Sequence, residues 1–288
     1  MRQIPLPAAA ALMTNSVLWG LSWIAFKFLQ AHGLHPLWSN TIIFSVCLLL
    51  LIAFRPAALR QMREHPGLLL VAITAGVTNA TFNGAIAFGD VVRVILLFYL
   101  MPVWAVILAR LVLKEAITPR SLMRVALGLI GAMIVLYKPS IGLPLPQSLA
   151  DWTAILGGLA FAFNNVMLLR LKGASDAARG VAMLSGAACV SAALGVLFAS
   201  LGMMSWPVLS MTLLPTLTLW SGLFLLAVVC LQYGASRLPA NISAVIMLIE
   251  ILAATVSAWA LGAADIRLQD LIGGALIISA PWLIRDKA

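Results

Sequence analysis

The chain has 288 residues, of which 63% are hydrophobic and only 9% are charged. A soluble globular domain has roughly 45–50% apolar and about 25% charged residues, so a soluble fold could neither bury this much apolar surface nor cover it with so few charges. The formal net charge of +9 does not indicate a nucleic-acid partner, because the basic residues lie in short clusters between long apolar runs. Composition also excludes disordered chains and disulfide-stapled extracellular domains, and it predicts an integral membrane protein embedded in a lipid bilayer.

The apolar runs have the length of membrane-spanning helices, which need roughly 20 residues to cross the hydrocarbon core. The sequence predicts ten such helices, over residues 8–29, 37–54, 67–88, 91–113, 121–137, 150–170, 180–201, 213–234, 239–261 and 268–284. The first run is longer than the apolar part of a signal peptide, and we expect it to be retained. The runs do not alternate as the strands of a transmembrane β-barrel would. The longest gaps, 55–66, 138–149 and 202–212, are expected to be loops.

Positive charge is distributed unevenly between the two sides of these helices. Of the 18 lysine and arginine residues, 14 fall on one side and 4 on the other. The smaller group consists of Lys27, Arg93, Lys138 and Arg267. Cytoplasmic loops carry the excess of positive charge, so we predict a multi-pass protein of a bacterial-type cytoplasmic (inner) membrane with both termini in the cytoplasm.

The two halves of the chain share a pattern. A very short turn at residues 89–93 separates two helices, and a similar turn follows at 236–241. At an offset of 148 residues, Pro102 falls on Glu250, each near the centre of its helix. Each half holds an odd number of helices, so the second copy would enter the membrane from the opposite side. The predicted inverted repeats are residues 1–140, with helices one to five, and residues 150–288, with helices six to ten.

Several motifs resemble the EamA-type domain of the drug/metabolite transporter superfamily. They are Leu18-Trp19-Gly20-Leu21-Ser22-Trp23 with Lys27, Tyr99-Leu100-Met101-Pro102-Val103-Trp104, Leu113-Lys114-Glu115-Ala116-Ile117-Thr118, the pair Gly128 and Gly131, Leu238-Pro239-Ala240, Leu261-Gly262 and Gly273-Gly274. Within the superfamily the chain is most similar to the YddG-type amino-acid exporters. This resemblance implies ten helices in an inverted five-plus-five repeat, cytoplasmic termini and export of amino acids from the cytoplasm.

The second half departs from the pattern of that family at two positions. The family often has a Glu-Pro pair in the ninth helix, whereas Glu250 is followed here by Ile251. The acidic residue that usually closes this helix is replaced by Ala263, although its counterpart in the first half, Glu115, is present. The role of Glu250 is therefore not transferred from the family.

The sequence contains no motif of an enzyme, such as a P-loop, an HExxH pair or a nucleophile elbow. The histidines, His32, His35 and His65, lie in or beside loops, and the cysteines, Cys47, Cys189 and Cys230, lie inside apolar runs. We interpret the cysteines as small buried hydrophobic residues. We therefore expect no enzymatic activity, no cofactor and no metal site.

Glu250 is the strongest candidate for a functional residue. An ionised side chain at mid-bilayer costs about 3 kcal/mol on insertion scales, so such residues usually face a cavity or a partner. Ser243 and Met247 share its helical face. Two interpretations stay open: Glu250 carries a proton or binds a substrate ammonium, or it is a protonated glutamate that hydrogen-bonds a neighbouring helix.

Other polar and aromatic side chains near mid-depth are candidate cavity walls, because a polar stripe on a membrane helix avoids lipid. The first helix presents Asn15, Trp19 and Ser22 on one face, for which helix packing is the alternative. The remaining candidates are Thr78, Asn79, Phe82, Tyr99, Pro102, Asn164 and Asn165. Pro102 leaves the Phe98 carbonyl without its usual donor, so we expect a kink that opens a pocket at Tyr99 and exposes the carbonyl to a substrate amine.

These features favour a secondary transporter that exports amino acids, aromatic ones included, or related small amphipathic metabolites by alternating access. No buried arginine that could clamp a carboxylate is evident, so we expect broad selectivity. The alternative is proton-coupled efflux of cationic drugs or other small metabolites, and a non-transporting membrane scaffold or scramblase is the alternative from a different class. The oligomeric state is left open.

Overall fold

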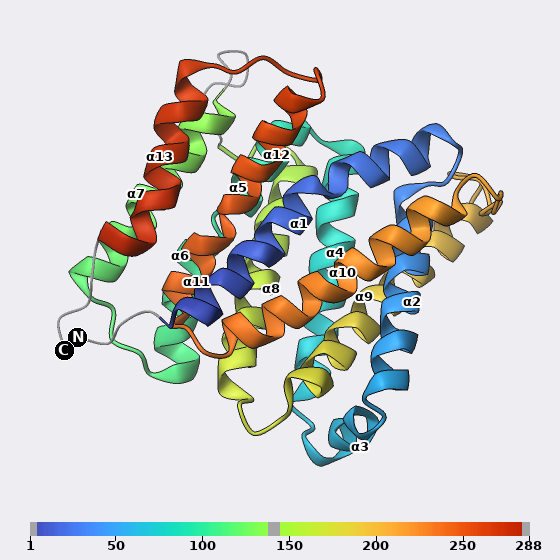
Figure 1. Ribbon diagram of the computed structural model, residues 1–288, viewed down its shortest axis with the longest axis horizontal. Coiled ribbons are helices and arrows are strands. Elements are labelled where there is room, and N and C mark those ends of the chain that lie inside the picture. Colours follow the sequence, from blue (N-terminus) through green and yellow to red (C-terminus); the bar gives the residue numbers. More distant parts are fainter. Residues whose placement is uncertain (1–4, 138–144, 284–288) are drawn as a thin grey trace.

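The structure, a computed structural model, describes residues 5–137 and 145–283 and contains helices but no strand within these ranges (Figure 1). The helices are α1 (Leu6–Ala31), α2 (Pro36–Phe54), α3 (Ala57–Glu64), α4 (Leu68–Phe88), α5 (Val91–Phe98), α6 (Met101–Leu108), the π-helix η1 (Ala109–Leu113), α7 (Pro119–Leu136), α8 (Leu149–Arg170), α9 (Asp176–Ser200), α10 (Leu214–Ala235), α11 (Ala240–Met247), α12 (Ile249–Ala260) and α13 (Leu268–Leu283). The prediction of an all-α fold is confirmed for these residues.

Nine segments of the described chain are helical, long and apolar enough to cross a membrane. Two of them combine shorter helices: Val92–Leu113 contains α5, α6 and η1, and Ala240–Ala260 contains α11 and α12. The tenth predicted span corresponds to α13, of which the structure describes 16 residues, and it is not among these nine segments. The protein is therefore a multi-pass helical membrane protein, and its tenth span stays a prediction.

The gap at 55–66 was expected to be a loop, and the structure corrects this expectation. It contains α3, in which Arg60 Nε donates to Glu64 Oε1 at 2.8 Å across one helical turn. Only Ala58 of this helix is buried, so α3 is a short surface helix without the apolar length to span. The gap at 202–212 is irregular as expected. Residues 138–144 of the remaining gap lie outside the described residues.

Glycines bring some helices into backbone contact. A Cβ added to Gly131 would lie 2.7 Å from the Gly273 carbonyl oxygen, and one added to Gly273 would lie 2.5 Å from the Gly131 carbonyl oxygen. These contacts join α7 to α13, which lie side by side at the left of Figure 1. On α7, Gly128 leaves room for the side chain of Leu248. The glycines therefore serve close helix packing, as predicted.

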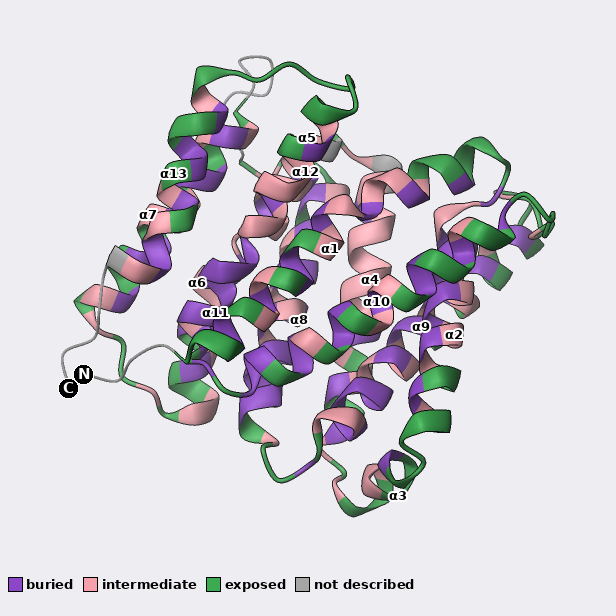
Figure 2. Cartoon of the chain, in the orientation of Figure 1, coloured by how far each residue is buried: buried purple, intermediate pink, exposed green. Residues whose placement is uncertain are grey.

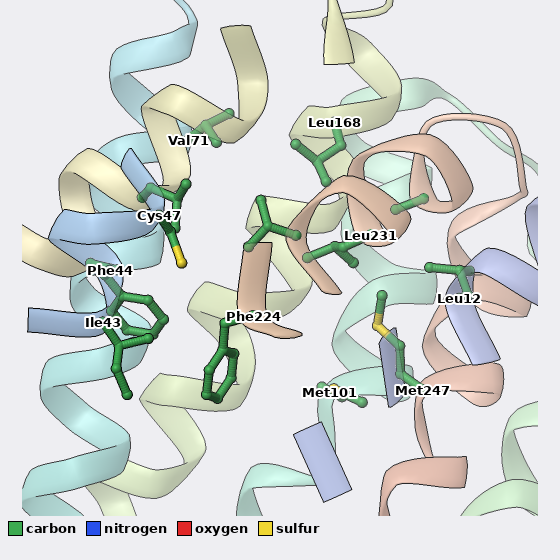
Figure 3. Close-up of a cluster of buried hydrophobic side chains, with 14 of the residues drawn as sticks. Leu12, Ile43, Phe44, Cys47, Val71, Met101, Leu168, Phe224, Leu231 and Met247 are labelled. Carbon is green, nitrogen blue, oxygen red and sulfur yellow. The ribbon is translucent and has the colours of Figure 1, made fainter. Parts of the chain in front are cut away.

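The buried core is built from aliphatic, aromatic and sulfur-containing side chains contributed by most of the helices. Figure 3 shows part of it, including Leu12, Ile43, Phe44, Met101, Phe224 and Met247. The thiol of Cys47 is also buried and contacts the Ser221 carbonyl at 3.1 Å. Cys189, by contrast, is exposed and Cys230 is partly exposed, so the expectation that all three cysteines are buried was wrong for these two. Exposed residues lie along the outer faces of α2, α10 and α13 (Figure 2), and many of them are apolar, as contact with lipid requires.

Basic residues gather at one end of the bundle. At this end α3 lies near the turn between α8 and α9, along the lower edge of Figure 1, and Gln61 Oε1 accepts a hydrogen bond from the Ser175 N–H at 2.8 Å. We call it the basic end, and its described basic residues are Arg55, Arg60, Arg63, Arg110, Lys114, Arg120, Arg124, Arg170, Lys172, Arg179 and Arg237. At the opposite end, Arg93 lies 3.7 Å from Asp151 and Arg267 lies 2.8 Å from Asp270. The charge bias in the sequence is thus a difference between the two ends of the folded bundle.

Candidate functional site

The first of two helix breaks separates α5 from α6 and follows from Pro102. Proline has no N–H, so it cannot donate to the Phe98 carbonyl one turn earlier. The backbone near Pro102 forms hydrogen bonds that span three residues instead of four. The Leu100 N–H donates to the Leu97 carbonyl at 3.3 Å, and the Val103 N–H donates to the Leu100 carbonyl at 3.0 Å. The expected kink is confirmed. The Phe98 carbonyl, which we expected to face a substrate amine, instead lies against Gly158 of α8, where any Cβ would overlap it.

The second break separates α11 from α12 at the corresponding place, but without a proline. The Leu248 N–H donates to the Val245 carbonyl at 3.1 Å, and the Ile251 N–H donates to the Leu248 carbonyl at 3.0 Å. Each bond spans three residues rather than four, so the chain forms a 3₁₀-like turn. The Glu250 carbonyl lies against Gly20 of α1, where a Cβ would overlap it. Each break therefore packs a carbonyl on a glycine from the first helix of the other half.

The two breaks meet through their polar side chains. The Tyr99 hydroxyl, at the first break, interacts with the Glu250 carboxyl, at the second. Tyr99 is buried, whereas Glu250 keeps part of its surface accessible. Glu250 takes part in none of the ion pairs among the described residues. A carboxyl in this setting is available to a proton or to a cation.

Three buried polar atoms on the helices around Glu250 have no hydrogen-bond partner in the part of the chain that the structure describes. They are Asn15 Oδ1, Asn165 Oδ1 and Ser243 Oγ. Ser243 lies on α11, before the break that leads to Glu250, and Asn165 Nδ2 contacts Met247 Sδ at 3.7 Å at the end of α11. Asn15 belongs to α1, which packs along α11 and α12. Since buried polar groups are normally paired, these atoms supply hydrogen-bonding capacity that the described residues do not use.

Trp19 lies in an aromatic cluster with α2 and α10. Its ring centroid is 4.6 Å from that of Phe224, edge-on, and 6.3 Å from that of Phe44. Ser22, one turn further along α1, is buried. Among the described contacts, none joins Trp19 to Tyr99 or Glu250, so the structure does not bring these predicted site residues together directly.

Asn164 joins α8 to α4. Its Nδ2 donates to the Val71 carbonyl at 2.9 Å and contacts Thr74 Oγ1 at 3.0 Å, and the side chain is buried. On α4 itself, Thr78 and Asn79 each donate to a carbonyl one turn earlier, at 2.8 and 3.0 Å, and both stay partly exposed. Asn164 thus satisfies its donor by helix packing, while Thr78 and Asn79 retain accessible surface.

A series of aromatic rings leads from α4 to the first break. The Phe98 ring centroid lies 4.7 Å from that of Phe82 and 5.9 Å from those of Tyr99 and Phe161. Of these rings, the sequence singled out Phe82 and Tyr99. Phe98 was noted only for its carbonyl, and Phe161 carries no polar or spacing signal, so only the packing of α8 on α5 reveals it.

Two arginines are buried, a feature that the sequence analysis did not predict. Arg124 is 1% and Arg179 is 2% exposed. Arg124 donates to Asn241 Oδ1 at the start of α11, and Arg179 donates to the Ala174 carbonyl and pairs with Asp176. Both lie at the basic end, away from the breaks. The sequence could not reveal their burial, because each stands near a helix start that reads as a solvated end.

Within the described ranges, no group of three His, Cys, Asp or Glu side chains is close enough to share a metal ion. The described site therefore offers a single carboxyl, hydroxyls, amides and aromatic rings. Groups of this kind bind a small amphipathic molecule by hydrogen bonds and apolar contact.

Comparisons with known proteins agree with this architecture. Residues 6–137 match the EamA-like transporter family. An uncharacterized transporter of Pseudomonas aeruginosa is 26% identical over 162 residues, covering 54% of this chain and 52% of that protein, so the match spans about half the length of the relative. A solved crystal structure is similar over 96% of this chain and 97% of that chain, with a TM-score of 0.79 and 18% identity, which shows a shared fold. Residues 6–137 are thus similar to the EamA-like transporter family, and the apolar helices show a multi-pass membrane protein.

Proposed function

We propose that this protein is a secondary transporter that exports amino acids or related small amphipathic metabolites through a central site at the two helix breaks. The observation that carries the proposal is the interaction between the Tyr99 hydroxyl and the Glu250 carboxyl, which joins the two halves of the chain. The family match of residues 6–137 supports membrane transport as the activity. A carboxylate in the interior offers charge-assisted hydrogen bonds to the ammonium group that every free amino acid carries.

The groups around Glu250 suit the remainder of such a substrate. The three unpartnered polar atoms on α1, α8 and α11 offer hydrogen bonds. The rings of Phe82, Phe98 and Phe161 offer an apolar and aromatic surface for a side chain. Both buried arginines are engaged at the basic end, so selectivity would rest on size and polarity rather than on a clamped carboxylate.

The correspondence of the two breaks supports alternating access. The break at Leu100 and the break at Leu248 are 148 residues apart, and each packs on a glycine from the other half. We infer two inverted five-helix repeats, residues 1–140 and 150–288, with α13 as the tenth span. Rocking of one repeat against the other would open the breaks to each side of the membrane in turn.

We further propose that the basic end faces the cytoplasm of a bacterial-type inner membrane, since cytoplasmic loops carry the excess of positive charge. With the three cysteines replaced by serine, Arg60→Cys on α3 should resist an impermeant thiol reagent in intact cells. Ser210→Cys, at the opposite end, should react. The reverse pattern, or equal labelling of both, would contradict this orientation.

Uptake into vesicles that contain the purified protein tests the transport proposal. Labelled threonine, methionine, phenylalanine and lysine should each enter faster than into empty vesicles, and several should compete weakly with one another. A single amino acid that binds a hundredfold tighter than the others would contradict broad selectivity. If none of the four enters above background, amino-acid transport is wrong, and a scaffold or scramblase role gains support.

One observation favours a second candidate, proton-coupled efflux of cationic drugs. Glu250 has no basic partner among the described ion pairs, so it could exchange a proton for an organic cation. In that case a pH gradient should drive ethidium transport, and Glu250→Gln should abolish the dependence on the gradient. Ethidium transport without amino-acid uptake would replace the first proposal by this one.

A further inference from the structure

A charged pocket lies at the basic end, between the start of α9 and the connection from α10 to α11. Its volume is about 360 Å³, and its polar lining consists of Lys172, Ser175, Asp176, Arg179, Ser236 and Arg237. Small-ligand sites typically measure roughly 300–1,000 Å³. Three basic residues and one acidic residue give this lining a net positive charge.

Asp176 forms ion pairs with both arginines of the pocket, Arg179 and Arg237. Arg179 NH2 pairs with Asp176 Oδ1, and Arg237 NH1 lies 3.1 Å from Asp176 Oδ2. The Arg237 guanidinium also lies 3.9 Å from the centroid of the Tyr233 ring, and its NH1 lies 3.0 Å from Ser236 Oγ. The Asp176 carboxylate is thus shared by two guanidinium groups. Together these three side chains carry a net positive charge.

Lys172 adds a third positive charge to the pocket. The Lys172 ammonium interacts electrostatically with Glu115, whose carboxyl is half-buried in the loop after η1. Burial raises the pKa of Glu115, although the Lys172 ammonium lowers it. Lys172 lines the pocket and Glu115 does not, so the ammonium group is placed where a bound anion could contact it.

An apolar groove of about 320 Å³ adjoins the pocket and shares Asp176 with it. Its apolar walls come from α2, α9 and α10 and include Leu51, Phe54, Ala177, Leu225, Val228 and Val229. Gly180 leaves the space for it, since an added Cβ would lie 3.0 Å from Leu51 and 3.5 Å from Val228. Phe54 is 73% and Val229 is 46% exposed, so the groove opens on the apolar outer surface.

Two further polar groups line the groove. Arg55, at the end of α2, lies on the wall toward the basic end. Gln232 also lines it, and its buried Oε1 has no hydrogen-bond partner within the described ranges. The groove therefore passes from polar groups near the pocket to apolar side chains deeper in the membrane.

We propose that the pocket and the groove together bind one anionic phospholipid from the leaflet at the basic end. Lys172 and Arg237 bind the headgroup phosphate, and one acyl chain lies in the groove between α2, α9 and α10. A free phosphate ion would use the pocket and leave the groove empty. A neutral lipid would use the groove and leave the positive charge of the pocket uncompensated. An anionic lipid satisfies both, because its charge and its acyl chains are joined at the same depth at which the pocket meets the groove.

Native mass spectrometry of the purified full chain tests this site, with dioleoyl phosphatidylglycerol compared with dioleoyl phosphatidylcholine. The first phosphatidylglycerol should bind about thirtyfold tighter than phosphatidylcholine, as expected from two basic contacts of roughly 1 kcal/mol each. The double variant Lys172→Gln/Arg237→Gln should lose this preference. The control Arg60→Gln/Arg63→Gln, which removes two arginines of α3 at the same end, should keep it.

A second pair of variants tests the groove independently of charge. Val229→Trp should fill the groove and weaken phosphatidylglycerol binding about as strongly as the double variant. The control is Leu226→Trp on the same helix, which is 47% exposed and does not line the groove, and it should bind as the parent does. Circular dichroism and thermal unfolding would establish that all variants are folded.

Three outcomes would overturn the proposal. Equal binding of the two lipids to the parent would show that charge does not select the ligand. Displacement of phosphatidylglycerol by inorganic phosphate, with binding unchanged in Val229→Trp, would assign the pocket to a free anion. A dimer of the parent that Val229→Trp dissociates would assign the groove to a second copy of the chain.

Discussion

The break between α5 and α6 and the break between α11 and α12 arise by different routes and end in similar arrangements. Pro102 removes a backbone donor at the first, whereas Leu248 tightens the second without any proline. In both, a carbonyl packs on a glycine from the other half, Gly158 in one case and Gly20 in the other. Proline is therefore not needed for a break of this kind. The two breaks differ most in the side chain that each supplies, a hydroxyl from the first and a carboxyl from the second.

The largest effect should come from adding a proline to α12, and it tests whether the second break is a true helix start. Val256→Pro, at an exposed position in the middle of α12, should destabilise the protein by about 3 kcal/mol, because it removes a helical hydrogen bond and clashes with the preceding turn. Ile249→Pro, at the first residue of α12, should cost about 1 kcal/mol or less, because proline is tolerated at a helix start. Chemical unfolding in detergent measures both. Equal losses would mean that α11 and α12 are one continuous helix.

The next effect concerns the glycines that cover the two carbonyls. Gly20→Val and Gly158→Val should each lower the free energy of unfolding by about 1–3 kcal/mol, because the added side chain overlaps a backbone oxygen. The control is Gly222→Val in α10, where an added Cβ has no neighbour within 4 Å. If one glycine variant is neutral, the two breaks are not packed alike.

Transport should distinguish the carboxyl from the hydroxyl. Glu250→Gln should reduce the initial rate of phenylalanine uptake into vesicles by roughly tenfold or more, since a charged hydrogen-bonding group is worth about 1.5–3 kcal/mol. Tyr99→Phe should reduce it by a smaller factor, because the carboxylate is kept and loses one neutral donor. A larger loss in Tyr99→Phe would reverse the roles that we assign to the two breaks.

The smallest effect is expected at Asn164, outside the breaks. Asn164→Leu should lower stability by about 1 kcal/mol, through loss of its bonds to α4, and leave the competition among amino acids unchanged. Thr78→Val is the control, because the Thr78 hydroxyl bonds only within its own helix among the described hydrogen bonds. A change in substrate preference in Asn164→Leu would make this residue part of the binding surface.

Features that depend on local chemistry could be predicted from the sequence. Long apolar runs predicted the spanning helices, and nine segments of the described chain are long and apolar enough to cross a membrane. This prediction succeeds because length and hydropathy decide whether a helix suits the bilayer. The bias of basic residues predicted a charged end, because successive helices alternate in direction. Pro102 predicted the first break, since a missing N–H acts within one helical turn.

Features that join distant parts of the chain depend on how the helices pack and could not be predicted from the sequence. The break at Leu248 has no sequence signal of its own, and the contact of Tyr99 with Glu250 spans residues far apart in sequence. The burial of Arg179 likewise depends on how α9 and α10 pack. The periodicity of apolar residues shows which face of a helix is apolar, but it does not show which helix packs against that face. The partners of each polar side chain therefore depend on helix packing.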